Sequence, residues 1–112
     1  VSSFLKEKGY DNFIINAWWD IYLSWNNATG NTPVVSIDNP FNEKEIFATL
    51  DIKNKSLSTS GTYKRKWDID WKEFHHILNP EQNNNNNEII SISLIADKCY
   101  ITDSYATACI AM

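Results

Sequence analysis

The sequence predicts an α+β domain of mostly antiparallel strands closed by a C-terminal helix. Several short segments carry apolar residues at every second position, which is the period of a strand. Clusters of asparagine, glycine and proline separate these segments, so neighbouring strands are expected to pair through turns. The last segment differs, because Cys99, Thr102, Ala106 and Cys109 follow helical spacing. A chain of 112 residues with this pattern is predicted to form at most one domain.

The first half of the chain predicts a short helix, then a strand or hairpin, then two further strands. Ser2 or Ser3 is placed to cap a helix that runs through Lys8, and Gly9 is expected to end it. Alternating apolar residues over 13–25 favour a strand or a hairpin. Turn-forming residues follow at 26–33, and two further strands are expected at 34–37 and 45–52.

The second half predicts four strands and the final helix. Its five consecutive asparagines, at 83–87, are interpreted as a solvated low-complexity insert. Cys99 and Cys109 lie too far apart in one helix for a disulfide, and both are expected to be buried small apolar residues. In chain order, the elements are two strands over 56–70 that pivot at Gly61, a turn at 70–72, a strand at 74–78, a strand at 89–96, and the helix from about Lys98.

Charge and hydropathy exclude two classes of partner or environment. The net charge is −4, whereas a nucleic-acid surface needs clustered lysine and arginine, so no nucleic-acid partner is expected. The basic run 64–66 is interpreted as a solvated strand face. No apolar run reaches the ~18 residues of a transmembrane helix.

Taken alone, the candidate site residues leave alternatives open. Asp103 and Thr107 are four residues apart on the predicted helix and share a face, where a carboxylate and a hydroxyl can hold Mg²⁺. Equally, Asp103 can be a helix-start acid while Thr107 packs. His75 and His76 are adjacent in a strand and point to opposite faces, so at most one faces a site. Residues 60–63 suit a backbone nest for phosphate, but also an ordinary turn.

Three blocks of sequence carry a resemblance to a known family. NAWWDIYLSW resembles an N-A-G-G-D-I strand followed by a glycine. STSGTYKRKWDIDWKEFHHILNP resembles an S-T-S-G-x-Y-x-R segment followed by I-D-G-K and H-I-I-D-P. SISLIADKCYITDSYATACIAM resembles S-V-T-V-I-A-x-S-C-x-x-A-D-A-x-A-T-A-L. In this order the blocks resemble the FAD:protein FMN transferases, the ApbE-like or thiamine biosynthesis lipoprotein family. The match runs from Asn16 to Met112 and corresponds to roughly the C-terminal third of a family member, so 1–112 is expected to be a partial domain.

The resemblance implies a set of site residues. The D-x-x-x-T pair of the family coordinates the Mg²⁺ that bridges the FAD pyrophosphate, which assigns Asp103 and Thr107 as metal ligands. The S-G-x-Y-x-R segment of the family lies beside the flavin nucleotide. The implied cofactor-binding residues are Ser60, Gly61, Tyr63, Arg65, His76 and Asp20, and His76 is also the catalytic candidate.

The implied reaction is phosphoryl transfer. The hydroxyl of a threonine in an acceptor flavoprotein attacks the FMN phosphorus of FAD, which is the FMN donor, and AMP leaves. Positioning and metal stabilisation of oxygen charge would do most of the work. The resemblance further implies a location at the cell envelope or its periplasmic side, with membrane association through an N-terminal lipid anchor outside these residues.

Two departures from the family pattern bear on activity. The upstream segment of the family, with its own lysine and flavin contacts, has no counterpart here, so the 112 residues alone are expected to be inactive. The I-I-D-P segment becomes 77–80, I-L-N-P, followed by E-Q-N where the family has T-G. The alternatives to a transferase are a non-catalytic flavin- or nucleotide-binding module and a non-functional gene fragment.

A third departure concerns tryptophan. Trp18, Trp19, Trp25 and Trp71 stand where the family has glycine, and the chain holds 5 tryptophans but 3 glycines. We hypothesise that these four are glycine in the cellular protein, because some bacterial lineages translate UGA as glycine and another code translates it as tryptophan. The four are then expected to crowd the cleft or to be unusually exposed, with Trp67 alone packed normally.

Overall fold

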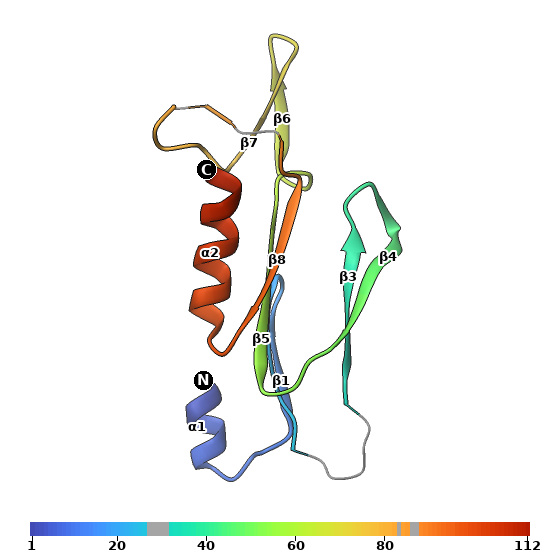
Figure 1. Ribbon diagram of the computed structural model, residues 1–112, viewed down its shortest axis with the longest axis vertical. Helices are drawn as coiled ribbons and strands as arrows, with labels where there is room; N and C mark the ends of the chain where they lie inside the picture. The colour runs from blue at the N-terminus through green and yellow to red at the C-terminus, as the bar shows by residue number, and fades with distance from the viewer. Residues whose placement is uncertain (27–31, 83, 86–87) are drawn as a thin grey trace.

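The computed structural model describes residues 1–26, 32–82, 84–85 and 88–112. They form an elongated molecule of 55 × 29 × 17 Å, built of antiparallel strands and a C-terminal helix (Figure 1). The predicted α+β class is therefore confirmed. Most of the predicted 26–33 turn and three of the five consecutive asparagines lie outside the described residues.

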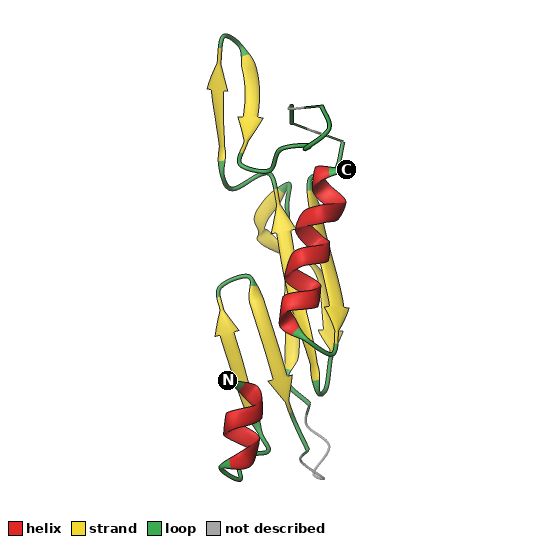
Figure 2. Ribbon diagram, turned by 90° about the vertical axis from the view of Figure 1, so that its left-hand side faces the viewer, coloured by secondary structure: helices red, strands yellow, loops and turns green. Residues whose placement is uncertain are grey.

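The main sheet has four antiparallel strands in the order β1-β2-β5-β8. A two-residue turn joins β1 to β2, which resolves the predicted strand or hairpin as a hairpin. The final helix, α2, lies along one face of the sheet against β5 and β8 (Figure 2). The bounds of these elements are β1 (Phe13–Ala17), β2 (Asp20–Ser24), β5 (Lys55–Gly61), β8 (Ser91–Ala96) and α2 (Cys99–Ala111).

Two further hairpins and a short helix complete the described fold. The hairpin of β3 (Val34–Asn39) and β4 (Asn42–Asp51) packs against the main sheet. The hairpin of β6 (Lys66–Ile69) and β7 (Lys72–His75) projects beyond the main sheet (Figure 1). The N-terminal helix α1 spans Ser2–Glu7.

Alternation along β5 gives the main sheet two different faces. Ser56 and Ser58 of β5 turn toward α2, where Ser58 Oγ lies 2.6 Å from Thr102 Oγ1. Leu57 points to the other face and forms the buried apolar cluster with Leu23 of β2 and Ile52. The partly buried residues Ile21, Val35, Ile37 and Leu50 pack around this cluster. The chain therefore has helix, sheet and hairpin in successive layers, with a polar seam under the helix.

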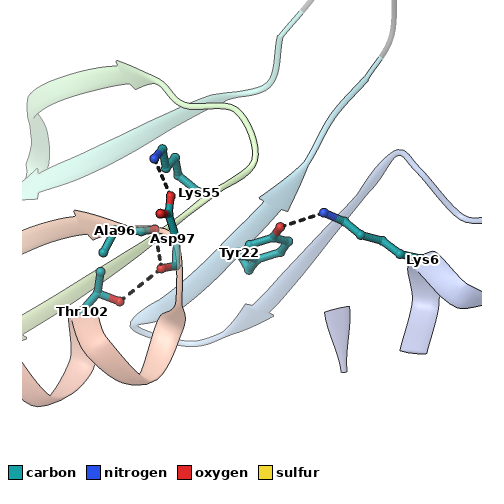
Figure 3. Close-up of polar contacts among 7 residues, drawn as sticks. Lys6, Tyr22, Lys55, Ala96, Asp97 and Thr102 are labelled. Carbon is teal, nitrogen blue, oxygen red and sulfur yellow. Dashed lines mark hydrogen bonds and ion pairs between the residues drawn. The ribbon is translucent and has the colours of Figure 1, made fainter. Parts of the chain in front are cut away.

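Ion pairs and hydrogen bonds tie the ends of elements together. Lys55, at the start of β5, pairs with Asp97, which follows β8, and Lys6 of α1 donates to the Tyr22 hydroxyl of β2 at 3.1 Å (Figure 3). The predicted serine cap of α1 is wrong, because Val1 is its N-cap residue and no side-chain cap bond forms. Neither helix in the described part of the chain is long and apolar enough to cross a membrane.

The cysteine prediction is also wrong in part. The buried face of α2 is Thr102, Ala106 and Ile110, at spacings of four residues. Cys109 is one residue, or about 100°, away from Ile110 around the helix and is exposed. Cys99 is half-buried at the first position of the helix, and both thiols are free.

The two-residue hairpin turns place tryptophan on left-handed backbone. Ala17 pairs with Asp20 across a turn in which Trp18 has φ 64°. Ile69 pairs with Lys72 across a turn in which Asp70 has φ 50° and Trp71 has φ 65°. Because both central residues of the second turn, Asp70 and Trp71, have positive φ, this turn is of type I′, for which Asp-Gly is a favoured sequence.

The exposure of the tryptophans agrees with the hypothesis in part. Trp18 is 79% exposed and Trp71 fully exposed, as expected of side chains without a packing site. Trp19 lines the cleft described below, whereas the expectation is wrong for Trp25, which is half-buried and is not among the residues that line the cleft. The expectation for Trp67 is wrong, because this side chain is 48% exposed on the projecting β6–β7 hairpin.

Candidate functional site

A cleft of about 410 Å³ opens where the end of β5 meets α2, the β1–β2 turn and the segment after β7. This volume lies in the range of small-molecule sites. All the residues predicted as site residues from sequence line this one cleft, although they come from four separate segments of the chain. They are Asp20, Ser60, Gly61, Tyr63, Arg65, His76, Asp103 and Thr107. Their chemical roles remain predictions.

The helix wall of the cleft is set by the polar seam beneath α2. Thr102 is buried and its hydroxyl meets Ser58 of β5 at 2.6 Å and donates to the Cys99 carbonyl at 2.8 Å. One turn further along, the Ser60 and Thr107 hydroxyls lie 3.0 Å apart. These contacts fix the rotation of α2, so that Asp103 and Thr107 share an exposed face toward the cleft, as their spacing predicts.

The acidic group on this wall is available to a ligand. Asp103 is exposed, and among the described residues it takes part in none of the ion pairs. The same part of the chain contains no group of three or more histidine, cysteine, aspartate or glutamate side chains arranged for a metal ion. That excludes a zinc-type cage of protein ligands among these residues. It leaves open a site for Mg²⁺, which needs only one or two carboxylates because water and phosphate oxygens complete its shell.

The opposite wall is aromatic and basic. A side chain at Gly61 would place its Cβ 2.7 Å from Tyr63 Cε1, so any other residue there would force the Tyr63 ring to shift. The Lys64 ammonium lies 4.6 Å from the centre of the Trp19 ring and 5.6 Å from that of Tyr63. The cation is also within 4 Å of Asp38 and Glu43 of the β3–β4 hairpin.

Burial raises the pKa of the Tyr63 hydroxyl above its usual value, and the negative charges of Asp38 and Glu43 raise it further. Tyr63 therefore keeps its proton at neutral pH, and its hydroxyl can donate a hydrogen bond into the cleft.

The adjacent histidines separate onto two faces, as predicted. His75 is 2% exposed, whereas His76 is exposed and lines the cleft. His76 Nδ1 lies 3.4 Å from the Arg65 carbonyl oxygen, which can only accept, so Nδ1 carries the proton of the neutral ring. Nε2 of His76 is then the unprotonated nitrogen. His75 has the opposite tautomer, because its Nδ1 accepts the Ile77 N–H at 3.2 Å.

Sequence reasoning missed other residues of the lining. Leu78 could have been found, because it is two residues from His76 on an extended segment. Trp19 directly precedes Asp20 and lines the same cleft. Lys64 was interpreted as part of a solvated basic run, and it is exposed, but its ammonium group also lies over the Trp19 ring and it lines the cleft. The contacts of Lys64 with the distant β3–β4 hairpin leave no local signal in the sequence.

Comparison with known proteins gives consistent relatives. The sequence model of the ApbE family matches residues 1–112. The FAD:protein FMN transferase of Buchnera aphidicola (subspecies Schizaphis graminum) is 27% identical over 110 residues, covering 96% of this chain and 32% of that protein. The chain thus spans about a third of the length of the curated relatives that it matches.

Solved structures share the fold. The ApbE protein from Thermotoga maritima superposes with a TM-score of 0.79 at 23% identity, over 89% of this chain and 32% of that one. The flavin transferase ApbE from Vibrio cholerae superposes with a TM-score of 0.76 at 20% identity, over 98% of this chain and 35% of that one.

Proposed function

The chain belongs to the ApbE family, and we propose that it forms part of an enzyme that transfers FMN from FAD to a threonine hydroxyl of a partner protein. The curated relatives bear the name FAD:protein FMN transferase. The observation that carries the proposal is the gathering of residues from four separate segments around one cleft of ligand-binding size.

The helix wall of the cleft fits Mg²⁺, the ion that such a transfer would use. Asp103 supplies an exposed carboxylate and Thr107 a hydroxyl on the same helix face. Ser60 holds the Thr107 hydroxyl at 3.0 Å, which limits its rotation. When bound, the ion would neutralise charge on the pyrophosphate oxygens.

The other wall fits the nucleotide. Arg65 provides a cation for phosphate oxygens, and the Tyr63 ring offers an aromatic face on which a planar ring can stack. Gly61 keeps the strand end free of a side chain where Tyr63 folds over it. The basic and aromatic groups thus face the acidic helix wall across the cleft.

His76 is the proposed proton acceptor of this reaction. Its Nδ1–H is directed at the Arg65 carbonyl, which leaves the Nε2 lone pair as the acceptor. In the proposed step the threonine oxygen forms a bond to the FMN phosphorus, and the pyrophosphate P–O bond breaks. AMP leaves with that bond's electron pair, and the threonine proton passes to His76 Nε2.

The direct test is covalent flavinylation. The native protein, meaning the polypeptide that the cell makes, is incubated with FAD, Mg²⁺ and an acceptor protein, and flavin fluorescence is followed on a denaturing gel. We expect a fluorescent acceptor band that disappears when the acceptor threonine is replaced by alanine. FAD binding without such a band would instead support a non-catalytic module, and absence of binding would contradict the proposal.

A second arm uses residues 1–112 by themselves. Because they span about a third of the relatives' length, we expect no flavinylated band from this segment alone. A strong band would show that the segment holds a complete site.

A further inference from the structure

Within the asparagine-rich loop after β7, Asn85 is hydrogen-bonded to the preceding segment, so the interpretation of the five asparagines as a solvated insert is wrong for this residue. Asn79 is buried, and its Oδ1 accepts the N–H groups of Glu81 and Gln82, both at 2.9 Å. The Asn79 N–H donates to the Asn84 carbonyl at 2.8 Å and closes the loop. This fold-back places Asn85 against the segment 75–79.

The side chain of Asn85 makes hydrogen bonds to the backbone of this segment, as a neighbouring strand would. Its Oδ1 accepts the His75 N–H at 3.2 Å, and its Nδ2 donates to the carbonyl oxygens of His75 at 2.8 Å and Ile77 at 2.7 Å. A single carboxamide therefore satisfies three backbone groups of the half-buried segment that extends past the end of β7.

The same segment forms part of the cleft with its other face. His75, Ile77 and Asn79 are buried, whereas His76 and Leu78 alternate with them and are exposed, and His76, Ile77 and Leu78 line the cleft. The bonds to Asn85 hold the backbone on both sides of His76. At the far end, Asn79 Nδ2 reaches the Met112 carbonyl at 3.4 Å, which links the segment to the end of α2.

We infer that Asn85 is a positioning residue that sets where His76 and Leu78 stand in the cleft, an inference that rests on the function proposed above. Without the carboxamide, the His75 N–H and two carbonyl oxygens lose their hydrogen bonds to Asn85, and the segment is expected to shift or admit water. A displacement of about 1 Å of a reacting group can cost up to about 100-fold in rate.

The test compares Asn85→Ala with the matched control Asn84→Ala in the native protein. The Asn84 side chain is exposed, and its Nδ2 donates to Gln82 Oε1. We expect Asn85→Ala to lower kcat for FMN transfer roughly 10- to 100-fold with KM for FAD within about 3-fold of wild type. Asn84→Ala is expected to leave both within about 2-fold.

A double-mutant cycle separates positioning from general loss of structure. If Asn85 acts through His76, Asn85→Ala costs less than about 2-fold in a His76→Ala background. An equal loss in both backgrounds would overturn the inference. Asn85→Asp retains the acceptor for the His75 N–H but turns a carboxylate toward two carbonyl oxygens, so it is expected to be at least as damaging as Asn85→Ala.

A readout independent of catalysis distinguishes failure of this inference from failure of the proposed function. Amide hydrogen exchange at His75 and Ile77 should be at least 10-fold faster in Asn85→Ala than in Asn84→Ala. This comparison holds even if the wild-type protein fails to bind FAD, which would contradict the proposed function alone. Unchanged exchange at both amides would overturn the role of Asn85.

Discussion

The cleft and the two tight hairpin turns differ in how well their residues suit the backbone beneath them. In the cleft, Gly61 stands where a side chain would collide with Tyr63, and small hydroxyl residues let α2 approach β5. In the turns, Trp18 and Trp71 occupy left-handed backbone that strongly favours glycine, and their side chains stand largely in solvent. At Gly61 in the cleft the residue type suits the space around the backbone, whereas at Trp18 and Trp71 in the turns it does not suit the backbone conformation.

The other left-handed positions sharpen this contrast. Asn54 and Asp70 also have positive φ, at 54° and 50°, and both are residue types that tolerate this conformation. Trp71 directly follows Asp70, so the turn carries Asp-Trp where Asp-Gly is the favoured pair. The geometry therefore supports the hypothesis that positions 18 and 71 are glycine in the cellular protein.

The largest effect is expected on the cleft side of the comparison. Asp103→Ala should lower FMN transfer by about 100-fold or more, because it removes the exposed carboxylate on the helix wall. Steady-state kinetics with Asn84→Ala as control measures it. An Asp103→Ala variant as active as the control would remove the reason for placing a metal on α2.

On the turn side, replacing tryptophan by glycine should stabilise the protein. A non-glycine residue on left-handed backbone costs roughly 1–2 kcal/mol, and the greater unfolded-state freedom of glycine returns about 0.4–1 kcal/mol of that gain. Trp71→Gly and Trp18→Gly should each raise the free energy of unfolding by about 0.5–1 kcal/mol in urea titrations.

The matched control is Trp67→Gly, which lies within β6 and should lower stability by about 0.5–1 kcal/mol. Destabilisation by all three changes would show that the turn tryptophans fit their positions. Mass spectrometry of the native peptide 14–25 then settles the identity of positions 18 and 19 directly, and tryptophan masses would refute the hypothesis.

The smallest expected effect is on the pKa of Tyr63, a cleft residue whose titration is influenced by two carboxylates of the β3–β4 hairpin. Its pKa is raised, first by burial and then by Asp38 and Glu43, so the neutral phenol is the form that folding favours. The resulting stability is fully present below the unfolded pKa of about 10 and is lost as pH rises through the higher folded value. Asp38→Asn with Glu43→Gln should lower the Tyr63 pKa without removing the part due to burial, as measured by ultraviolet titration.

Local spacing predicts the fold class and the shared helix face of Asp103 and Thr107, whereas the other cleft residues were predicted from the resemblance to the family. The period of two in β5 and the four-residue spacing of Asp103 and Thr107 are set by backbone geometry alone. The Asn85 contacts could not be predicted, since a run of identical asparagines does not indicate which one meets His75. Lys64 was missed for a related reason, because its carboxylate neighbours lie on a hairpin distant in sequence.

The central claim is that the cleft binds FAD with its pyrophosphate against Asp103 and Thr107. Calorimetric titration of FAD into the native protein, with Mg²⁺ and then with a chelator in excess, tests it most directly. We expect Mg²⁺ to tighten FAD binding by at least 10-fold in wild type, and by less than about 2-fold in Asp103→Ala. Equal tightening by Mg²⁺ in both proteins would contradict the claim.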